Sequence, residues 1–276
     1  MSANVDKNVV AGFGDEWSRF DQSSLDDEEL ERLFNNYFRI FPWEDLPAGS
    51  VGFDLGCGSG RWAKMVAPRV GTLNLIDPSP AALAVAKRNL ADAKNAIFHV
   101  ADAGCIPLEE NSCDFGYSLG VLHHIPDTTA GLRECVKRLK PGAPFLLYLY
   151  YSFDNRPAWF RTVWHLSDIG RQAISRMPHW LRYGMSQLIA GTIYWPFARA
   201  AKVLEKTGMD VSHIPLSQYR ETSFYTMRTD ALDRFGTRLE KRFSKAEIET
   251  MMRDAGLEEI AFSTTSFWTA VGYRRR

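Results

Sequence analysis

One short stretch constrains the fold of this chain more than any other: Val51-Gly-Phe-Asp-Leu-Gly-Cys-Gly-Ser-Gly-Arg-Trp62. Its pattern predicts an apolar strand ending at Asp54 and an amphipathic helix opening at about Arg61. Between them lies a turn with three alternate glycines, Gly56, Gly58 and Gly60. Glycine adopts positive φ without strain and lets a ligand approach the backbone where a Cβ would clash. This order is typical of α/β nucleotide-binding folds, although a tight turn without a ligand gives the same pattern.

Two more acidic residues follow predicted strands, and they favour a nucleoside ligand. Residues 73–77 form a short apolar strand ending at Asp77, whose carboxylate can accept hydrogen bonds from both hydroxyls of a ribose. Enzymes that bind nicotinamide dinucleotides use an acid at the same place, so Asp77 indicates a nucleoside without saying which one. The strand at 96–100 is followed by Asp102, for which those enzymes have no fixed need.

Helix signals alternate with these strands, as the crossovers of a parallel sheet require. Ser79 and Pro80 match the N-cap and the first residue of a helix. A later helix ends at Pro141-Gly142. Residues 144–151 then form a near-continuous apolar strand, which is expected to be buried on both faces.

Together with the segment 113–127, which matches a fourth strand and its loop, these elements resemble the class I S-adenosylmethionine-dependent methyltransferases of the small-molecule type. The first motif of that family has the form (D/E)-x-G-x-G-x-G, and the resemblance covers residues 51–151. It implies an α/β fold: a Rossmann-like seven-stranded sheet with helices on both faces, whose last strand is inserted antiparallel between the fifth and sixth. It also implies S-adenosyl-L-methionine as the cofactor.

The resemblance assigns the cofactor contacts residue by residue. Asp77 would hold the ribose, and Asp102 would reach the adenine amino group. Trp17, in the segment before the fold, is a candidate to cover the cofactor. The full set of expected contacts is Asp54, Gly56, Cys57, Gly58, Gly60, Asp77, Pro78, Asp102, Ala103, Leu119 and Trp17.

The chain divides into three expected domains. Residues 1–45 form a helical lid, in which a capping box at Ser24-Leu-Asp-Asp27 opens a helix through about Ile40. Residues 46–151 and 241–276 form the cofactor-binding domain. Its closing part has a second capping box at Ser244-Lys-Ala-Glu247, a C-terminal Gly256, and two strands, at 257–265 and 267–273.

Residues 152–240 form the third domain, a helical cap inserted after the fifth strand. The insertion is too long for a plain loop, and its aromatic and Arg residues predict two or three helices over the acceptor site. The family resemblance implies that such an insertion sets substrate choice. Three residues just before the closing unit are candidates to bind the acceptor: Tyr219, Arg220 and Tyr225.

His123 and His124 are the candidates for catalysis, because they follow the fourth strand where the acceptor should approach. Imidazole is the side chain best suited to remove a proton near neutral pH, and a hydroxyl or carbon acceptor needs such a base. His124 is slightly favoured, while both could instead be pocket walls. His165, His179 and His213 lie in the cap, where packing or surface roles are expected.

Composition excludes several classes of protein. With 33 basic and 33 acidic residues the formal net charge is zero, so no general attraction to nucleic acid is expected. The loop after the fourth strand, Ser118-Leu-Gly-Val, also lacks the (N/D)-P-P-(Y/F) motif of nucleic-acid methyltransferases. The four cysteines form no C-x-x-C pair, so no metal site and no disulfide framework are indicated, which fits a cytoplasmic protein.

The favoured function is methyl transfer to an oxygen, carbon or nitrogen of a small biosynthetic molecule. One alternative is a lipid-like acceptor such as a prenylated quinone, with peripheral membrane contact through the cap. Residues 159–200 motivate it, because Arg alternates there with Trp, Tyr and Leu as in an interfacial helix pair. A binding-only protein is the non-enzyme alternative, against which the intact glycines and acids argue.

Overall fold

The computed structural model describes residues 4–153, 157–211, 214–264 and 268–276. The chain forms two compact units. The first contains the residues up to Gln22, Leu30–Ser152 and Leu239–Arg276, and the second contains Ser23–Glu29 and Phe153–Arg238. The boundary falls inside one helix, so the second unit combines the inserted segment with a short N-terminal piece.

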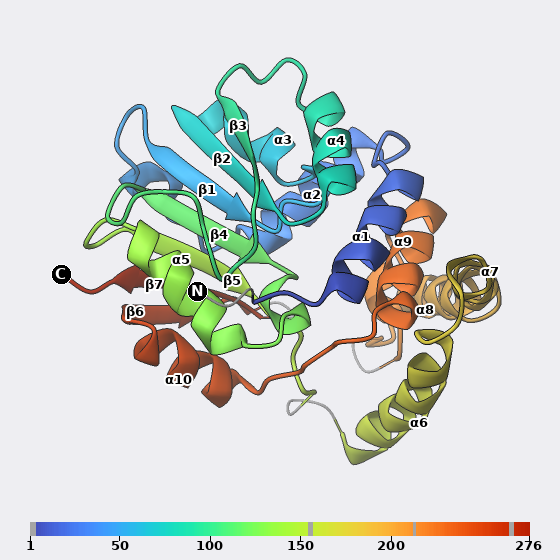
Figure 1. The fold of residues 1–276 in the computed structure, drawn as a ribbon. Helices are drawn as coiled ribbons and strands as arrows, with labels where there is room; N and C mark the ends of the chain where they lie inside the picture. Colours follow the sequence, from blue (N-terminus) through green and yellow to red (C-terminus); the bar gives the residue numbers. More distant parts are fainter. Residues whose placement is uncertain (1–3, 154–156, 212–213, 265–267) are drawn as a thin grey trace. The chain divides into compact units, whose positions relative to one another are not determined.

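The first unit is built on a seven-stranded sheet with the order β3-β2-β1-β4-β5-β7-β6 (Figure 1). The strands are β1 Val51–Leu55, β2 Thr72–Asp77, β3 Ala96–Val100, β4 Phe115–Leu119, β5 Pro144–Tyr148, β6 Leu257–Phe262 and β7 Thr269–Arg274. The first five are parallel, and β7 pairs antiparallel with both β5 and β6. The predicted fold class is confirmed, including the inserted last strand.

Helices lie on both faces of this sheet (Figure 1). They are α2 Asp27–Tyr37, α3 Ala63–Val66, α4 Pro80–Asn89, α5 Thr128–Arg138 and α10 Lys245–Asp254, whereas α1 Lys7–Arg19 lies at the carboxyl edge of the sheet. Short 3₁₀ turns occupy Trp43–Asp45 (η1), Ala67–Arg69 (η2) and Leu122–His124 (η3). Because βα connections bring every loop after β1–β5 to the carboxyl edge, the candidate site residues of those loops gather there.

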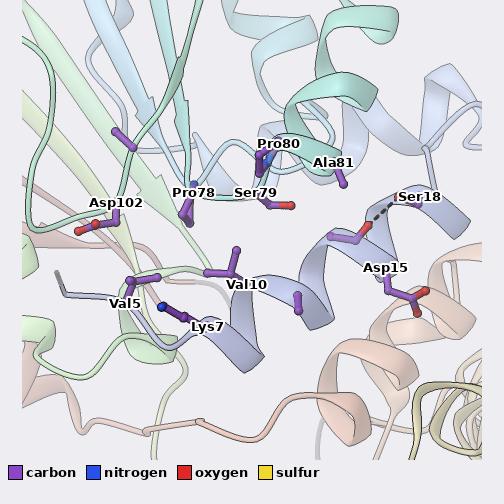
Figure 2. Close-up of a pocket in the computed structure, with 13 residues that line it drawn as sticks. Val5, Lys7, Val10, Asp15, Ser18, Pro78, Ser79, Pro80, Ala81 and Asp102 are labelled. Atoms are coloured by element: carbon purple, nitrogen blue, oxygen red, sulfur yellow. Dashed lines mark hydrogen bonds between the residues drawn. The ribbon is translucent and has the colours of Figure 1, made fainter.

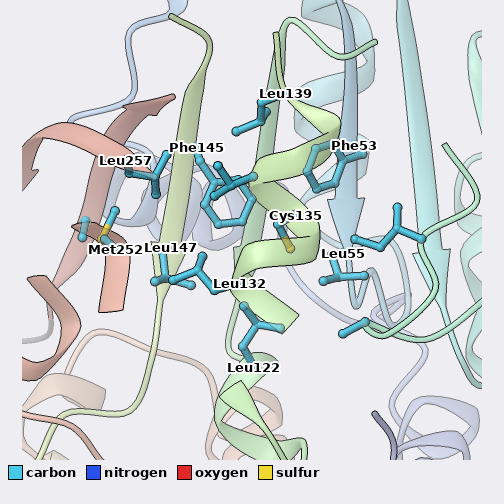
Figure 3. Packing of buried hydrophobic residues seen from close by; sticks show 14 of the residues in the cluster. Phe53, Leu55, Leu122, Leu132, Cys135, Leu139, Phe145, Leu147, Met252 and Leu257 are labelled. Atoms are coloured by element: carbon cyan, nitrogen blue, oxygen red, sulfur yellow. The ribbon is translucent and has the colours of Figure 1, made fainter. Parts of the chain in front are cut away.

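Side chains of the central strands alternate between the two faces of the sheet, and each face has its own layer of buried residues. Phe53 and Phe145 point toward α5 and α10, where they pack with Leu132 and Met252 (Figure 3). On the opposite face the ring of Tyr117 lies 5.2 Å from that of Phe38, which follows α2. Burial on both faces explains why the central parallel strands are mainly apolar.

The helix ends agree with their sequence signals in most places. Ser79 caps α4, its side chain accepting from the Ala82 backbone, and the capping box of Ser244 and Glu247 opens α10. Gly256 has a φ of +99° directly after the α10 C-cap. These ends are set by local hydrogen bonds, which is why a short window of sequence suffices to find them.

Two helix expectations were wrong. The box at Ser24 is not used, because α2 begins at Asp27 and the backbone N–H of Glu29 donates to Asp26 instead. A carboxylate at this end also complements the helix dipole better than a hydroxyl does. The helix expected from about Arg61 is the single turn α3, which gives way to a 3₁₀ turn at Pro68, whose ring nitrogen cannot donate a hydrogen bond.

The second unit is mainly helical, with α6 Ala158–Ile174, α7 His179–Ile189, α8 Trp195–Lys206 and α9 Phe224–Gly236. A five-residue π-helix at Ala190–Tyr194 joins α7 to α8 without a break. It ends two residues before Pro196, which cannot donate to the preceding turn, and a π-turn accommodates that missing bond.

Charged side chains fix both ends of α9 in the second unit. Glu29 accepts from the Ser223 backbone N–H at 3.0 Å and from the Thr226 hydroxyl at 2.7 Å. Arg182 donates to the Gly236 carbonyl at 2.8 Å, and Arg171 to the Thr237 carbonyl at 2.9 Å. An anion at the N-terminus and cations at the C-terminus complement the helix dipole, so part of the insertion's Arg content is structural.

Candidate active site

The three glycines of the turn after β1 have positive φ, at +77°, +53° and +76°, but they face different neighbours. A Cβ on Gly56 would collide with Val121, and one on Gly60 would collide with α4. A Cβ on Gly58 would instead meet the indole of Trp17, whose Nε1 is 2.8 Å from that position. Gly56 and Gly60 therefore permit close packing within the fold. Of the three glycines, Gly58 is the one that faces α1, through Trp17.

Two buried carboxylates flank this turn. Asp77 accepts from the backbone N–H of Gly58 at 3.0 Å and from that of Ser79 at 2.8 Å, so it ties the glycine turn to the start of α4. Burial raises its pKa to about 6, against the lowering effect of those two bonds. Burial also raises the pKa of Asp54 to about 8, the Tyr117 hydroxyl partly offsetting this and Asp77 adding to it. Within the described part of the chain, Oδ2 of Asp54 has no hydrogen-bond partner.

The third acid lines a hollow of about 790 Å³ together with the start of α4 and one side of α1 (Figure 2). Asp102 accepts from the Gly104 backbone at 2.6 Å and from the Asn4 backbone at 3.3 Å. The Asn4 side chain also exchanges two hydrogen bonds with the backbone of Asp127. The hollow, with Pro78 and Asp102 on its wall, has the place and polarity expected for an adenine ring.

Helix α1 lies across the carboxyl edge of the sheet. Besides the contact of Trp17 with the glycine turn, a Cβ on Gly14 would lie 2.7 Å from the Ser79 hydroxyl, so a glycine is needed there. Phe13 lies one helical turn before Trp17, and its ring is 5.1 Å from that of His124. The helix therefore covers the turn, the start of α4 and the histidine loop, which are all parts of one site.

Both predicted histidines lie in the 3₁₀ turn after β4, and the structure separates their environments. His123 is 0 % exposed, with its ring 3.9 Å from the ring of Tyr150 and 3.9 Å from that of His124. Neither of its ring nitrogens has a partner among the described residues. Burial lowers its pKa well below the usual range, with His124 and Arg242 adding to the effect, so His123 is neutral.

His124 is oriented by a residue far away in the sequence. Its Nδ1 lies 2.7 Å from the carbonyl oxygen of Leu239. A carbonyl can only accept, so Nδ1 carries the proton and the lone pair of a neutral ring is on Nε2. This is the tautomer that a general base acting through Nε2 requires.

The residues 239–243, which we call the return segment, connect the histidine loop to the end of β5. The backbone N–H of Lys241 donates to the His123 carbonyl at 3.1 Å, and that of Phe243 donates to Tyr150 at 2.9 Å. The Lys241 ammonium donates to the carbonyls of Ile125 and Pro126. The segment thus holds the loop in place, and the sequence carried no signal for this because nothing local marks residues 239–243 as a partner of residues 123–126.

A row of aromatic rings continues from the histidine loop along the same edge. The Tyr150 ring is 5.9 Å from that of Tyr148, which is 5.1 Å from Tyr37, which in turn is 4.8 Å from Trp62. The guanidinium of Arg61 stacks on Trp62 at 4.2 Å. Only Arg61 and Trp62 fall within the glycine motif, so sequence reasoning missed most of this aromatic surface.

Some of the remaining predicted site residues lie at the candidate site in the first unit, and others lie in the second unit. Cys57, Ala103 and Leu119 are buried beside the glycine turn and the loops after β3 and β4. In the second unit the ring of Tyr219 is 5.2 Å from that of Tyr194, and Arg220 pairs with Glu205 at 2.8 Å. His213 lies outside the described residues.

These residues fit S-adenosylmethionine on structural grounds. Gly58 packs against the Trp17 indole, where a Cβ would not fit, and Asp54 has a buried oxygen without a partner among the described residues. The hollow beside Asp102 is large enough for an adenine ring. Asp77 would exchange its backbone donors for ribose hydroxyls, and Trp17 would cover the cofactor. All these groups belong to the first unit.

Comparison with known proteins agrees with this geometry. Residues 53–147 match the family described as "Methyltransferase domain". The chain is 27% identical over 182 residues to the ubiquinone biosynthesis O-methyltransferase of Xanthomonas axonopodis pv. citri, covering 58% of this chain and 73% of that protein. It is 34% identical over 109 residues to phosphoethanolamine N-methyltransferase 2 of Caenorhabditis elegans, covering 38% of this chain and only 25% of the relative's length.

Solved structures share the fold at low sequence identity. Human N-acetylserotonin methyltransferase in complex with SAM superimposes with a TM-score of 0.55 at 15% identity, over 97% of this chain and 58% of that one. A possible histamine N-methyltransferase from Thermotoga maritima gives 0.51 at 13% identity, over 96% and 100%. At such identities the likeness shows the fold alone.

Residues 53–147 are thus a methyltransferase domain, and the sheet order and the three strand-end acids agree with the fold of the class I S-adenosylmethionine-dependent methyltransferases. S-adenosylmethionine is the cofactor that a methyltransferase domain of this fold uses. Among the helices of the described residues, none has the length and apolar character needed to cross a membrane.

Proposed function

We propose that this chain transfers a methyl group to a hydroxyl oxygen of a small, planar acceptor molecule, with His124 as the general base. The observation that carries the proposal is the 2.7 Å contact between His124 Nδ1 and the Leu239 carbonyl, which leaves Nε2 as the basic atom. A thiolate or neutral amine acceptor would need no base. The row of aromatic rings beside the histidine loop favours a planar partner.

The mechanism follows from what the residues can do. When bound, S-adenosylmethionine supplies an electrophilic methyl group. Asp77 and Asp102 would fix the nucleoside, and the Gly58 turn would let it approach the backbone. His124 would accept the hydroxyl proton at Nε2, while neutral His123 packs behind it. Phe13 and Trp17 on α1 would exclude water, and alignment of the acceptor supplies much of the acceleration.

Both relatives act on small molecules according to their names, although they differ in the acceptor atom. One is an O-methyltransferase of ubiquinone biosynthesis and the other a phosphoethanolamine N-methyltransferase. A positioned base is expected for the first type of reaction and not for the second. We extend the O-type reaction to this chain on the strength of His124, and we place the activity in biosynthetic metabolism of the cytoplasm.

The test is transfer of a trideuteromethyl group from labelled S-adenosylmethionine to a panel of hydroxylated aromatic compounds, read by mass spectrometry. We expect a mass gain on a hydroxyl oxygen, lost in His124→Ala and kept in His165→Ala, whose histidine lies on α6. Products labelled only on nitrogen, or equal rates in the two variants, would contradict the proposal.

We also propose that the second unit selects the methyl acceptor, and that Tyr219, Arg220 and Tyr225 take part in binding it. This proposal is supported by its aromatic content and by the position of the insertion after β5. Since Arg220 pairs with Glu205, Arg220→Ala should lower the melting temperature slightly as well as raise KM for the acceptor. Unchanged KM in Arg220→Ala and in Tyr225→Ala would contradict it.

One observation favours a second candidate, an acceptor at a membrane surface. The helices α6–α8 expose large apolar side chains, with Trp180 at 72 %. The others include Trp159, Leu166, Ile169, Leu188 and Trp195. No acidic residue occurs between Asp168 and Glu205, while five basic ones do. Two of the five, Arg171 and Arg182, are buried, and the other three, Arg176, Arg199 and Lys202, are at least partly exposed. Apolar side chains flanked by cations match the interface of an anionic bilayer.

Co-sedimentation with vesicles tests this candidate. We expect binding to phosphatidylglycerol-containing vesicles and weaker binding to pure phosphatidylcholine. Trp180→Glu combined with Leu188→Glu should abolish it, whereas Met209→Glu, also at an exposed apolar residue but beyond α8, should not. Equal sedimentation of all three proteins, or none with either vesicle, would contradict membrane contact.

A further inference from the structure

The return segment contains a buried carboxylate, that of Glu240, in which one oxygen accepts hydrogen bonds and the other has no partner among the described residues. The side chain of Glu240 is only 2 % exposed. Its Oε1 accepts from Arg242 twice, from Nε at 2.9 Å and from Nη2 at 2.8 Å. Its Oε2 is buried and has no hydrogen-bond partner within the described residues. A buried carboxylate oxygen without a donor is costly, so a donor is expected there in the working enzyme.

The surroundings of Glu240 connect it to the base. Its neighbour Leu239 is the residue whose carbonyl orients His124. Its partner Arg242 stacks on the ring of Tyr150 at 5.0 Å and donates to the Tyr151 carbonyl at 3.2 Å. The Tyr150 ring is in turn 5.5 Å from the ring of His124. The guanidinium that pairs with Glu240 and the imidazole of His124 therefore both lie against the Tyr150 ring.

Arg242 limits what Glu240 can do. Because the guanidinium already occupies Oε1, Oε2 is the oxygen that remains for a further donor. An anionic group at this point would be repelled, and a neutral group without a donor would leave the oxygen unsatisfied. The ligand group that suits Oε2 is an O–H or N–H donor.

From this arrangement we infer that Glu240 is a specificity residue for the acceptor. It accepts a hydrogen bond from a second donor, a hydroxyl or an amine, placed next to the hydroxyl that His124 deprotonates. The preferred acceptors are thus planar molecules with two neighbouring donor groups, of which one is methylated and the other is held by Glu240. The inference rests on the proposed transfer to a hydroxyl.

The experiment measures binding of acceptor probes to the enzyme saturated with S-adenosylhomocysteine, by calorimetry. The probes are catechol and 2-aminophenol, which have two neighbouring donors, and phenol and 2-methoxyphenol, which have one. A hydrogen bond to a charged group changes affinity by about 10–100-fold, so the wild-type protein should prefer each two-donor probe over phenol by at least about tenfold. Equal affinities, or no binding of any probe, would overturn the inference.

Glu240→Gln should reduce this preference to less than about threefold, while leaving the affinity for S-adenosylhomocysteine unchanged. Glu249→Gln is the matched control, since Glu249 pairs with Arg253 at 2.7 Å on the exposed side of α10, and it should keep the full preference. A Glu240→Gln protein that discriminates as well as wild type would mean that Oε2 binds water or a structural partner. If that variant does not fold, the wild-type comparison among the four probes still decides the question.

The two proposals can fail separately. Preference for two-donor probes without methyl transfer to any hydroxyl would contradict the proposed reaction and leave the role of Glu240 standing. Methyl transfer to a hydroxyl at equal efficiency for one-donor and two-donor compounds would contradict the role of Glu240 alone.

Discussion

The Nδ1 atom of His124 lies 2.7 Å from the carbonyl oxygen of Leu239, 115 positions further along the chain. This single contact selects the tautomer of the imidazole and links the loop after β4 to the segment that returns from the second unit. The orientation of the His124 ring therefore depends on the position of Leu239, the residue at which the chain returns to the first unit.

Replacement of His124 is the most direct test of the base. His124→Ala should lower kcat by about 10²–10⁴-fold, because a positioned general base contributes about that much. The affinity for S-adenosylhomocysteine should not change. His123→Ala should lower the melting temperature more than kcat, since His123 is fully buried and neutral. The reverse outcome, with the larger loss of kcat in His123→Ala, would move the assignment by one residue.

The glycine turn gives a prediction that distinguishes two glycines of one motif. Gly58→Ala places a methyl group against the Trp17 indole at a φ of +53°, and it should weaken binding of S-adenosylhomocysteine strongly. Gly60→Ala places it against α4 and should mainly lower the melting temperature. Adding Trp17→Ala to Gly58→Ala should recover some thermal stability by relieving the clash. Identical effects of the two glycine variants on affinity would show that both face the ligand.

Asp77 should matter to both the cofactor and the apo fold. Asp77→Ala should weaken cofactor binding by about 1.5–3 kcal/mol, the usual value of hydrogen bonds to a charged group. It should also lower the melting temperature of the free enzyme, because the carboxylate joins the Gly58 and Ser79 backbones. Calorimetry and thermal melts measure the two effects, and unchanged affinity would place the ribose elsewhere.

The buried acids predict how stability depends on pH. The pKa of Asp54 is raised from 3.8 to about 8 and that of Asp77 from 3.8 to about 6. The folded state therefore binds more protons than the unfolded state in these ranges, so the free energy of unfolding should fall as pH rises from about 4 to about 8. Thermal melts across this range should show the decline in the enzyme without cofactor.

Asp54→Asn should flatten this dependence and raise the melting temperature at pH 8, by about 2–4 °C for each kcal/mol relieved. Asp92→Asn is the control, because Asp92 is exposed in the loop after α4, and it should leave the slope unchanged. A slope that persists in Asp54→Asn would assign the effect to other groups.

Excision of the insertion tests the division of labour between the units. Joining Ser152 to Leu239 through a short Gly/Ser linker removes Phe153–Arg238 and retains the Leu239 carbonyl. We expect binding of S-adenosylhomocysteine to persist and methyl transfer to be lost. A second deletion that also removes Leu239 and Glu240 should disturb the histidine loop and lower thermal stability further. Loss of cofactor affinity in the first deletion would show that the insertion holds the cofactor.

Local signals predicted much of the fold correctly. The strands around Asp54, Asp77 and Asp102 and the caps at Ser79 and Ser244 are encoded within a few residues. Where the prediction was wrong, a neighbour within the same stretch decided the outcome: Asp26 displaced Ser24 as the cap of α2, and Pro68 cut short the helix after the glycine turn.

The candidate site was predictable only in part. The glycines and strand-end acids could be found because a nucleoside imposes their spacing on a single βαβ unit. The aromatic row of Tyr37, Tyr148 and Tyr150, and the pair Glu240–Arg242, could not be found. Each of these residues lies in a segment whose sequence pattern predicts only a core-packing element or a loop.

By itself, then, the sequence determined the strands, their crossovers and the class of cofactor, since a motif or pattern within a short stretch of the chain marks each of them. The tertiary structure decided which glycine faces α1 and which nitrogen of His124 is basic. It also decided that Glu240 has a buried oxygen with no partner among the described residues. The first two properties arise from contacts between residues that are distant in the chain: Trp17 with Gly58, and His124 with Leu239. No periodicity or motif specifies such pairs, because their proximity exists only after the sheet has formed and the return segment has paired with the histidine loop.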